Sequence, residues 1–278
     1  MKRLFVNPGV SVILACITCL TVSTSGKADG DQLRLLATGS STVAPVMSEL
    51  SRKYEQAHPN VRIDVQTGGS SRGVADAING LSDIGMVSRD LKPSEKVLHA
   101  YTIAWDGIAV ITHNDNPVKA IDRSQLEQIY RGELRDWGAV GGKAGLPIVV
   151  VNKSAAHSTL ELFLSYLNIE ADQVHASIII GDNQQGIKTV AGNPAAIGYV
   201  SIGAALQAQK QGTPITLLVL DGVEPTISNV RDKKYPITRP LNVVTRESPN
   251  DVIGDLLVFA HSDEGADIIE SLSFVTLK

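Results

Sequence analysis

Short apolar segments alternate with segments of helical spacing through most of the chain, and polar turns separate the two kinds. Residues 33–38 are largely apolar and predict a strand, and residues 46–57 then place apolar side chains on one face of a helix. Residues 61–67 alternate apolar and polar positions, as a half-buried strand does. This alternation of strands and helices predicts an α/β fold with a mixed, mainly parallel sheet and flanking helices.

The same alternation continues to residue 272, so the later part of the chain predicts a second α/β unit, without a strict sequence repeat. Ligands of α/β sheets bind outside the carboxyl ends of the strands, so the polar turns at those ends predict a cleft between the two units. Further strands are expected at 84–87, 106–113, 148–151, 178–180 and 196–201, an extended segment at 235–245, and further helices at 74–80, 123–131, 160–167, 184–190, 252–260 and 264–272.

The first residues follow another pattern. Lys2 and Arg3 precede an apolar run, 10–22, and small polar residues follow it, which is the order of a secretory signal peptide. The run is shorter than the roughly 20 residues of a membrane-spanning helix. We therefore expect residues 1–28 to be removed and the protein to be periplasmic. The alternative is a buried N-terminal helix.

Both cysteines, Cys16 and Cys19, lie within that leader, so the mature chain would have no disulfide, cysteine-bound metal or thiol nucleophile. The histidines show no HExxH or paired spacing, and no GxSxG nucleophile elbow occurs. We expect neither a metal nor a cofactor.

The charge balance restricts the partners. Twenty-five basic and 29 acidic residues give a formal charge of −4. Losing Lys2 and Arg3 makes it −6, and losing Lys27 as well makes it −7. An acidic protein is a poor general binder of nucleic acid. It can still bind an anion, but only through a local and directional site.

Four polar turns after predicted strands supply such a site. Hydroxyls and backbone N–H groups at a helix N-terminus favour an oxyanion, and arginine adds a planar fork of donors. Each turn alone is also explained by helix capping or a tight turn, but the repetition of hydroxyls and glycine favours binding. The candidates are Ser40, Ser41, Thr42, Ser70, Ser71, Arg72, Ser88, Arg89, Lys153, His157, Ser158 and Thr159.

Asp106 precedes an apolar strand and allows three interpretations. It can be a cap, a salt-bridge partner, or the acceptor of a proton from a protonated oxyanion. The third interpretation favours phosphate, because sulfate carries no proton at neutral pH.

Five segments in register resemble the phosphate-binding proteins of phosphate ABC transporters. This resemblance implies a two-lobed type II periplasmic binding protein fold. Its lobes would be 29–112 with 243–278, and 113–242, with crossings near His113 and Val243. The segments are GSSTVAPVMSEL (39–50), GGSSRGVADAINGLSDIGMVSRDL (68–91), WDGIAVITHNDNPV (105–118), IYRGELRDWGAVGG (129–142) and NPAAIGYVSIGAA (193–205).

The resemblance also implies a function: a monomer that captures inorganic phosphate between its lobes and delivers it to an inner-membrane ABC permease, without catalysis. The family's binding hydroxyls fall on Ser41, Thr42 and Ser71 here, and its aspartate after the third strand falls on Ser88. The fourth turn, Arg-x-x-Gly-Ser-Gly-Thr in the family, here keeps only its threonine. It reads Lys153-Ser154-Ala155-Ala156-His157-Ser158-Thr159.

That altered turn keeps two alternatives open. The same scaffold can carry a different oxyanion or serve a signalling protein. A secreted phosphatase or serine hydrolase would need a nucleophile with a base, and His157 beside Ser158 is the local candidate.

Overall fold

The computed structural model describes residues 32–277, and the predicted signal peptide with its two cysteines lies outside these residues. The strands are β1 Leu33–Gly39, β2 Val61–Thr67, β3 Ile84–Val87, β4 His99–His113, β5 Ala120–Ile121, β6 Val149–Lys153, β7 Ile178–Ile180, β8 Ala196–Ser201, β9 Ile215–Leu217, β10 Val219–Leu220 and β11 Thr238–Thr245. The helices are α1 Ala44–Ala57, α2 Ser70–Ile78, α3 Arg123–Tyr130, α4 Ser158–Leu167, α5 Asn183–Ala191, α6 Ile202–Lys210, α7 Ile227–Arg231, α8 Asp251–Ala260 and α9 Asp263–Ser271.

Most predicted elements are confirmed, with differences at their ends and several short elements missed. β4 begins at His99 rather than 106, because its first half pairs antiparallel with β11, from His99 opposite Thr245 to Gly107 opposite Thr238. α2 begins at Ser70 rather than 74, so a segment predicted to be a turn forms the first turn of a helix. The sequence did not predict α6, α7, β5, β9 or β10. Within residues 32–277 no helix has the length and apolar character that crossing a membrane requires.

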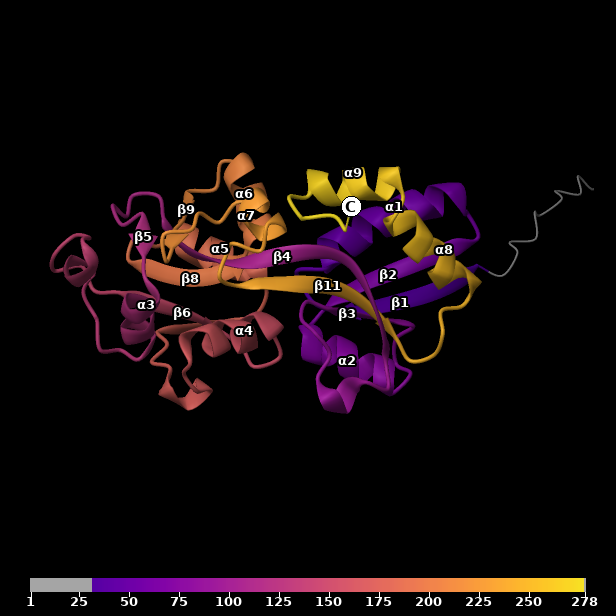
Figure 1. Cartoon of the computed structure of the whole chain (residues 1–278), viewed down its shortest axis with the longest axis horizontal. Coiled ribbons are helices and arrows are strands. Elements are labelled where there is room, and N and C mark those ends of the chain that lie inside the picture. The colour runs from indigo at the N-terminus through magenta and orange to yellow at the C-terminus, as the bar shows by residue number, and fades with distance from the viewer. Residues whose placement is uncertain (1–31, 278) are drawn as a thin grey trace, which may run out of the picture. The chain divides into compact units, whose positions relative to one another are not determined.

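Two parallel groups of strands are joined through antiparallel ones (Figure 1). β2, β1 and β3 form one parallel group, and β8, β6 and β7 form the other. Between them, β11 pairs antiparallel with β3 and β4, and β4 pairs antiparallel with β8. The mixed α/β sheet with flanking helices is therefore confirmed.

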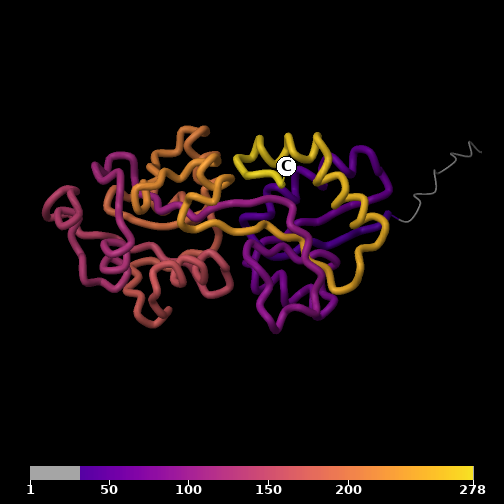
Figure 2. The backbone as a smooth tube through the Cα atoms, viewed as in Figure 1, coloured from indigo at the N-terminus to yellow at the C-terminus, as the bar shows by residue number. Residues whose placement is uncertain are grey.

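The buried apolar residues form two large clusters, here called the first core and the second core. The first core takes residues from β1, β2, β3 and α1 together with α8 and α9, so the two ends of the described chain pack together (Figure 2). The second core is built on β6 and β8 and on helices α3 to α6.

Buried residues of β4 belong to both cores, and the chain changes core again where β11 begins. Along β4 the change lies between Ala104 and Ile108, and the second change lies between Ile237, which precedes β11, and Leu241 within it. Both changes come earlier in the chain than the predicted crossings at His113 and Val243. The division into two lobes stays a prediction, with each core as the centre of one lobe.

An aromatic cluster lies at the centre of the second core. The Phe163 ring is fully buried and stacks on Tyr199, with 3.8 Å between ring centroids. The Phe163 and Tyr130 rings meet edge to face, with 4.8 Å between ring centroids. The Tyr130 hydroxyl donates a hydrogen bond to the Val151 carbonyl oxygen. The cluster therefore fixes α4 against β6 and β8.

We expect Phe163→Ala to lower the free energy of unfolding by about 3–5 kcal/mol, because it removes a buried ring and leaves a cavity. Val258→Ala is the control, since Val258 is 71% exposed and its loss should change stability by less than about 0.5 kcal/mol. Urea denaturation measures both variants. A cost below about 1 kcal/mol for Phe163→Ala would contradict the central place of this ring.

Candidate functional site

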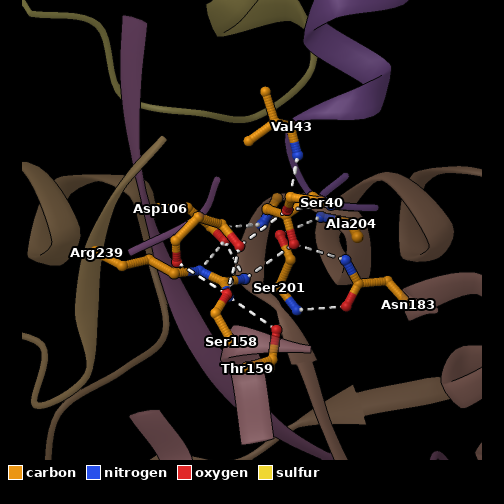
Figure 3. A network of polar contacts seen from close by, with 12 residues as sticks. Ser40, Val43, Asp106, Ser158, Thr159, Asn183, Ser201, Ala204 and Arg239 are labelled. Atoms are coloured by element: carbon orange, nitrogen blue, oxygen red, sulfur yellow. Dashed lines mark hydrogen bonds and ion pairs between the residues drawn. The ribbon is translucent and has the colours of Figure 1, made fainter. Parts of the chain in front are cut away.

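A buried arginine on β11 lies at the centre of a polar network (Figure 3). The Arg239 side chain is fully buried and donates to Asp106 Oδ2 from Nη2 at 2.9 Å and from Nε at 3.2 Å. Nη1 donates to Thr159 Oγ1 at 2.8 Å, and Nη2 donates to Thr42 Oγ1 at 3.1 Å. One guanidinium thus connects β4, the start of α1 and the start of α4.

Four serine hydroxyls form a cluster beside this guanidinium. Ser88 Oγ lies 2.9 Å from the hydroxyls of Ser40 and Ser158, and 3.4 Å from Nη1 of Arg239. Ser70 Oγ lies 3.0 Å from Ser158 Oγ and accepts from the Ser88 backbone N–H at 3.1 Å. Ser40, Ser70 and Ser88 come after β1, β2 and β3 of the first core, whereas Ser158 begins α4 of the second core. The site therefore combines groups from both cores.

An asparagine extends the network to α5. Asn183 Nδ2 donates to Thr42 Oγ1 at 2.9 Å, and its Oδ1 accepts from the Ser201 N–H at 3.3 Å. Both Thr42 and Asn183 are buried, and they also line a pocket of about 400 Å³. We call the set Ser40, Thr42, Ser70, Ser88, Asp106, Ser158, Thr159, Asn183 and Arg239 the Arg239 network.

Three of the four helices that begin at the Arg239 network lack a side-chain N-cap, whereas the fourth, α5, begins at Asn183 and is capped by Asp182. Among the helices in 32–277, α3, α5, α6, α7, α8 and α9 each have a side-chain N-cap. The helices α1, α2 and α4 have none, and these three begin at the Arg239 network. Their first-turn N–H groups therefore lack the usual side-chain acceptor, and their positive dipole ends converge on one place.

Ser40 supports the capping interpretation in part. Its Oγ accepts from the N–H groups of Thr42 at 3.1 Å and Val43 at 3.4 Å, just before α1 begins. The same hydroxyl donates to Ser88 Oγ at 2.9 Å. Ser40 thus orders the turn and also belongs to the network.

Asp106 is a salt-bridge partner, one of the three interpretations of the sequence. Oδ2 accepts two hydrogen bonds from Arg239, and Oδ1 accepts one from the Gly203 N–H at 3.2 Å. Because both oxygens are engaged by N–H donors, this carboxylate holds Arg239 in position and neutralises its charge. The alternative role as acceptor of a ligand proton receives no support from this geometry.

Several candidate residues lie outside the network. Ser41 is half-buried and lines the adjacent pocket, whereas Ser71, about 100° further around α2 than Ser70, is exposed. Arg72 is exposed and pairs with Asp76 at 3.1 Å. Arg89 is buried but pairs with Glu95 at 2.6 Å. Direct contact between these residues and a ligand stays a prediction.

Lys153 and His157 also lie outside the network. The Lys153 amine is buried and donates to the Gly181 carbonyl oxygen at 3.2 Å. Burial and the nearby Arg239 charge lower the pKa of Lys153 to about 7, although Asp182 opposes the shift. Burial, and next the Lys153 charge, lower the pKa of His157. The turn that departs from the family pattern thus contains a lysine whose pKa lies near 7.

The pair that the hydrolase alternative needed, His157 with Ser158, does not form. His157 Nδ1 lies 3.0 Å from Ser154 Oγ rather than next to Ser158. The Ser158 hydroxyl instead contacts Ser70 and Ser88. In the part of the chain that the structure describes, no group of three or more His, Cys, Asp or Glu residues is arranged to hold a metal ion.

Sequence reasoning missed Arg239 and Asn183. Arg239 is the one charged residue of the segment 235–245, which was expected to be extended, and that isolated charge was the available signal. Asn183 follows the predicted strand 178–180 in one more polar strand-end turn, so the rule that found the other turns also applied to it.

Comparison with known proteins identifies relatives along nearly the whole chain. A family model described as a PBP superfamily domain matches residues 21–264. A Clostridium perfringens crystal structure of a putative phosphate ABC transporter substrate-binding protein with bound phosphate is 34% identical, with a TM-score of 0.82, covering 88% of this chain and all of that one. An ABC-type phosphate transport receptor from Vibrio cholerae is 28% identical, with a TM-score of 0.71, covering 87% of this chain and 99% of the receptor.

A curated relative agrees with these structures. The phosphate-binding protein PstS of Borreliella burgdorferi is 28% identical over 250 residues, which cover 86% of this chain and 88% of the relative.

Lys153 should make stability depend on pH. Its pKa is about 7 in the folded chain and about 10.4 when unfolded, so between these values the unfolded chain binds more protons. The free energy of unfolding should therefore rise with pH in this window, by up to about 1.4 kcal/mol per unit. Lys153→Met should remove that slope, so the stability difference between variant and parent changes steadily from about pH 7 to 10 and is flat below.

Chemical denaturation at several pH values measures this slope. Lys143→Met is the control, because Lys143 is exposed and its removal should leave the slope unchanged. Equal slopes in the parent chain and Lys153→Met would show that the lysine is not buried as described.

Proposed function

The chain belongs to the phosphate ABC transporter substrate-binding proteins of the PBP superfamily, and from this premise we propose that it binds inorganic phosphate at the Arg239 network and delivers it to an ABC importer. The family consists of substrate-binding proteins rather than enzymes. The ligand would be held between two lobes, each built around one core.

The observation that carries this proposal is the convergence of three helix N-termini without side-chain caps around one buried arginine. Helix N-termini present N–H donors and positive dipole ends, and together they favour a small anion. Asp106 balances the arginine charge, so the site attracts an anion mainly through oriented dipoles and hydroxyls rather than through net charge.

The hydroxyl content suits a dehydrated phosphate. A tetrahedral oxyanion needs many short hydrogen bonds when it leaves water, and bonds to a charged acceptor are stronger than neutral ones. Ser40, Ser70, Ser88 and Ser158 each present a hydroxyl that can donate to a phosphate oxygen or accept from a protonated one. Serines therefore suit both protonation states of phosphate near neutral pH.

Gly69 supports a closed arrangement of the two lobes. Its φ of +91° is a conformation that side chains rarely adopt, and a Cβ there would lie 2.2 Å from the Ala156 carbonyl oxygen. Next to it, the Ser71 N–H donates to the same oxygen at 3.2 Å. The second turn of the first core thus contacts the fourth turn of the second core directly.

The altered fourth turn supports one second candidate, a different tetrahedral oxyanion. Ser158 and Thr159 of this turn belong to the network, whereas Lys153 and His157 do not. Calorimetry with phosphate, sulfate and arsenate distinguishes the two. Tight binding of another oxyanion with no heat from phosphate would favour this second candidate.

We further propose that the chain acts as a monomer outside the cytoplasmic membrane, after loss of residues 1–28, with an inner-membrane permease as its partner. The leader pattern and the names of its relatives support this location.

Arg239→Met should weaken phosphate binding by at least about thirtyfold, because truncating a buried, charge-paired donor costs about 2–5 kcal/mol. Arg239→Met combined with Asp106→Asn tests the same loss without leaving an unpaired buried carboxylate. Arg52→Met is the matched control and should leave the Kd within about twofold, because Arg52 is exposed, pairs with Glu49 and is not a site candidate. Isothermal calorimetry gives the Kd, and thermal unfolding shows that each variant is folded. Full affinity in the double variant would refute the assigned site.

Gly69→Ala should weaken phosphate binding by about tenfold or more, because the added Cβ separates the two turns that meet on closure. Gly141→Ala is the control, since Gly141 has a similar φ of +82° and no atom near an added Cβ. Both variants carry backbone strain, so an equal loss of affinity in both would point to strain rather than blocked closure.

A further inference from the structure

A second group of charges joins the two cores outside the Arg239 network. Glu161 lies in the first turn of α4, two residues after Thr159. Its Oε1 lies 2.9 Å from Lys92 Nζ, and its Oε2 lies 3.4 Å from Arg89 Nε. One carboxylate beside the second core thus pairs with two cations that follow β3. We call Glu161, Arg89 and Lys92 the Glu161 clasp.

Arg89 is a fixed cation, held in place by its own side of the molecule. Its two terminal nitrogens donate to the Glu95 carboxylate at 2.6 and 2.8 Å, and its side chain is 4% exposed. Its backbone carbonyl accepts from Asn242 Nδ2 at 2.8 Å. Within the described residues its buried Nε has no hydrogen-bond partner, and Glu161 is the charge paired with that atom. One donor of a rigid arginine therefore remains for a carboxylate from the other core.

We propose that Glu161 is a positioning residue for lobe closure, and that the clasp raises phosphate affinity without touching phosphate. This inference rests on the proposed function. When the lobes separate, Arg89 keeps Glu95, whereas Glu161 and Lys92 return to water. Because the clasp exists only in the closed form, its free energy shifts the closure equilibrium and adds to ligand affinity.

The clasp should also respond to salt. Glu161 and Lys92 have side-chain exposures of 43% and 46%, so ions reach this pair more easily than the buried Arg239 pair. Exposed ion pairs contribute modestly and are screened at high ionic strength. The part of phosphate affinity that depends on Glu161 should therefore disappear at about 1 M salt, where the screening length is about 3 Å.

Glu161→Gln in the full chain tests the proposal by calorimetry with inorganic phosphate. We expect a Kd about three- to tenfold weaker at low ionic strength, and a difference that vanishes in high salt. Glu127→Gln is the matched control: it removes the same charge from a pair at the C-terminal end of α3, with the C-cap residue Arg131 at 3.0 Å, and should leave the Kd unchanged. Adding Lys92→Met to Glu161→Gln should cause no further loss, since the two groups act as a pair.

Small-angle scattering of the ligand-free chain separates this inference from the proposed function. The radius of gyration of Glu161→Gln at low salt should exceed that of Glu127→Gln, because the closed form is less populated. If the parent chain binds no phosphate, the proposed function fails and this comparison still tests the clasp. Equal radii with equal affinities in the two variants would overturn the clasp.

Discussion

A buried guanidinium constrains this molecule more than any other group. Arginine carries five N–H donors that cannot lose their charge, so a fully buried one requires acceptors on several sides. Arg239 finds them on β4, before α1 and at the start of α4, with Asp106 2.9 Å away as counter-charge. The approach of α4 to β11 and to the turn before α1 follows from this requirement.

The buried ion pair itself does not explain stability. Removing two charges from water costs several kcal/mol per ion, and their attraction recovers this only with good geometry and further hydrogen bonds. Here the extra bonds to Thr42, Thr159 and the Gly203 N–H supply that geometry. The pair is better understood as a device that fixes one arrangement of groups from both cores.

The capping pattern has a similar logic. A side-chain N-cap contributes about 1 kcal/mol, and six described helices have one. α1, α2 and α4 do without it, so the fold forgoes about 3 kcal/mol where the three helices meet. These helices use no side-chain acceptor for their first-turn N–H groups, and although Ser71 of α2 donates to the Ala156 carbonyl oxygen, the positive ends of the three helices still favour an oxyanion, which links the loss of helix stability to binding.

Local patterns determined most of the architecture. Periodicity predicted most strands and helices, because the spacing of apolar residues within an element shows which of its sides faces the core. The polar turns at strand ends located Ser40, Thr42, Ser70, Ser88, Ser158 and Thr159. The tertiary structure alone decided which hydroxyls turn inward, since Ser70 and Ser71 are indistinguishable in sequence yet differ by one step around α2. It also decided the partners of the charges. Arg72 pairs with Asp76, a neighbour in the same helix, whereas Arg89 also meets Glu161 of α4 and Arg239 meets Asp106, 133 residues earlier. Pairing at such separation depends on how β4 and β11 align, and no local pattern records that alignment.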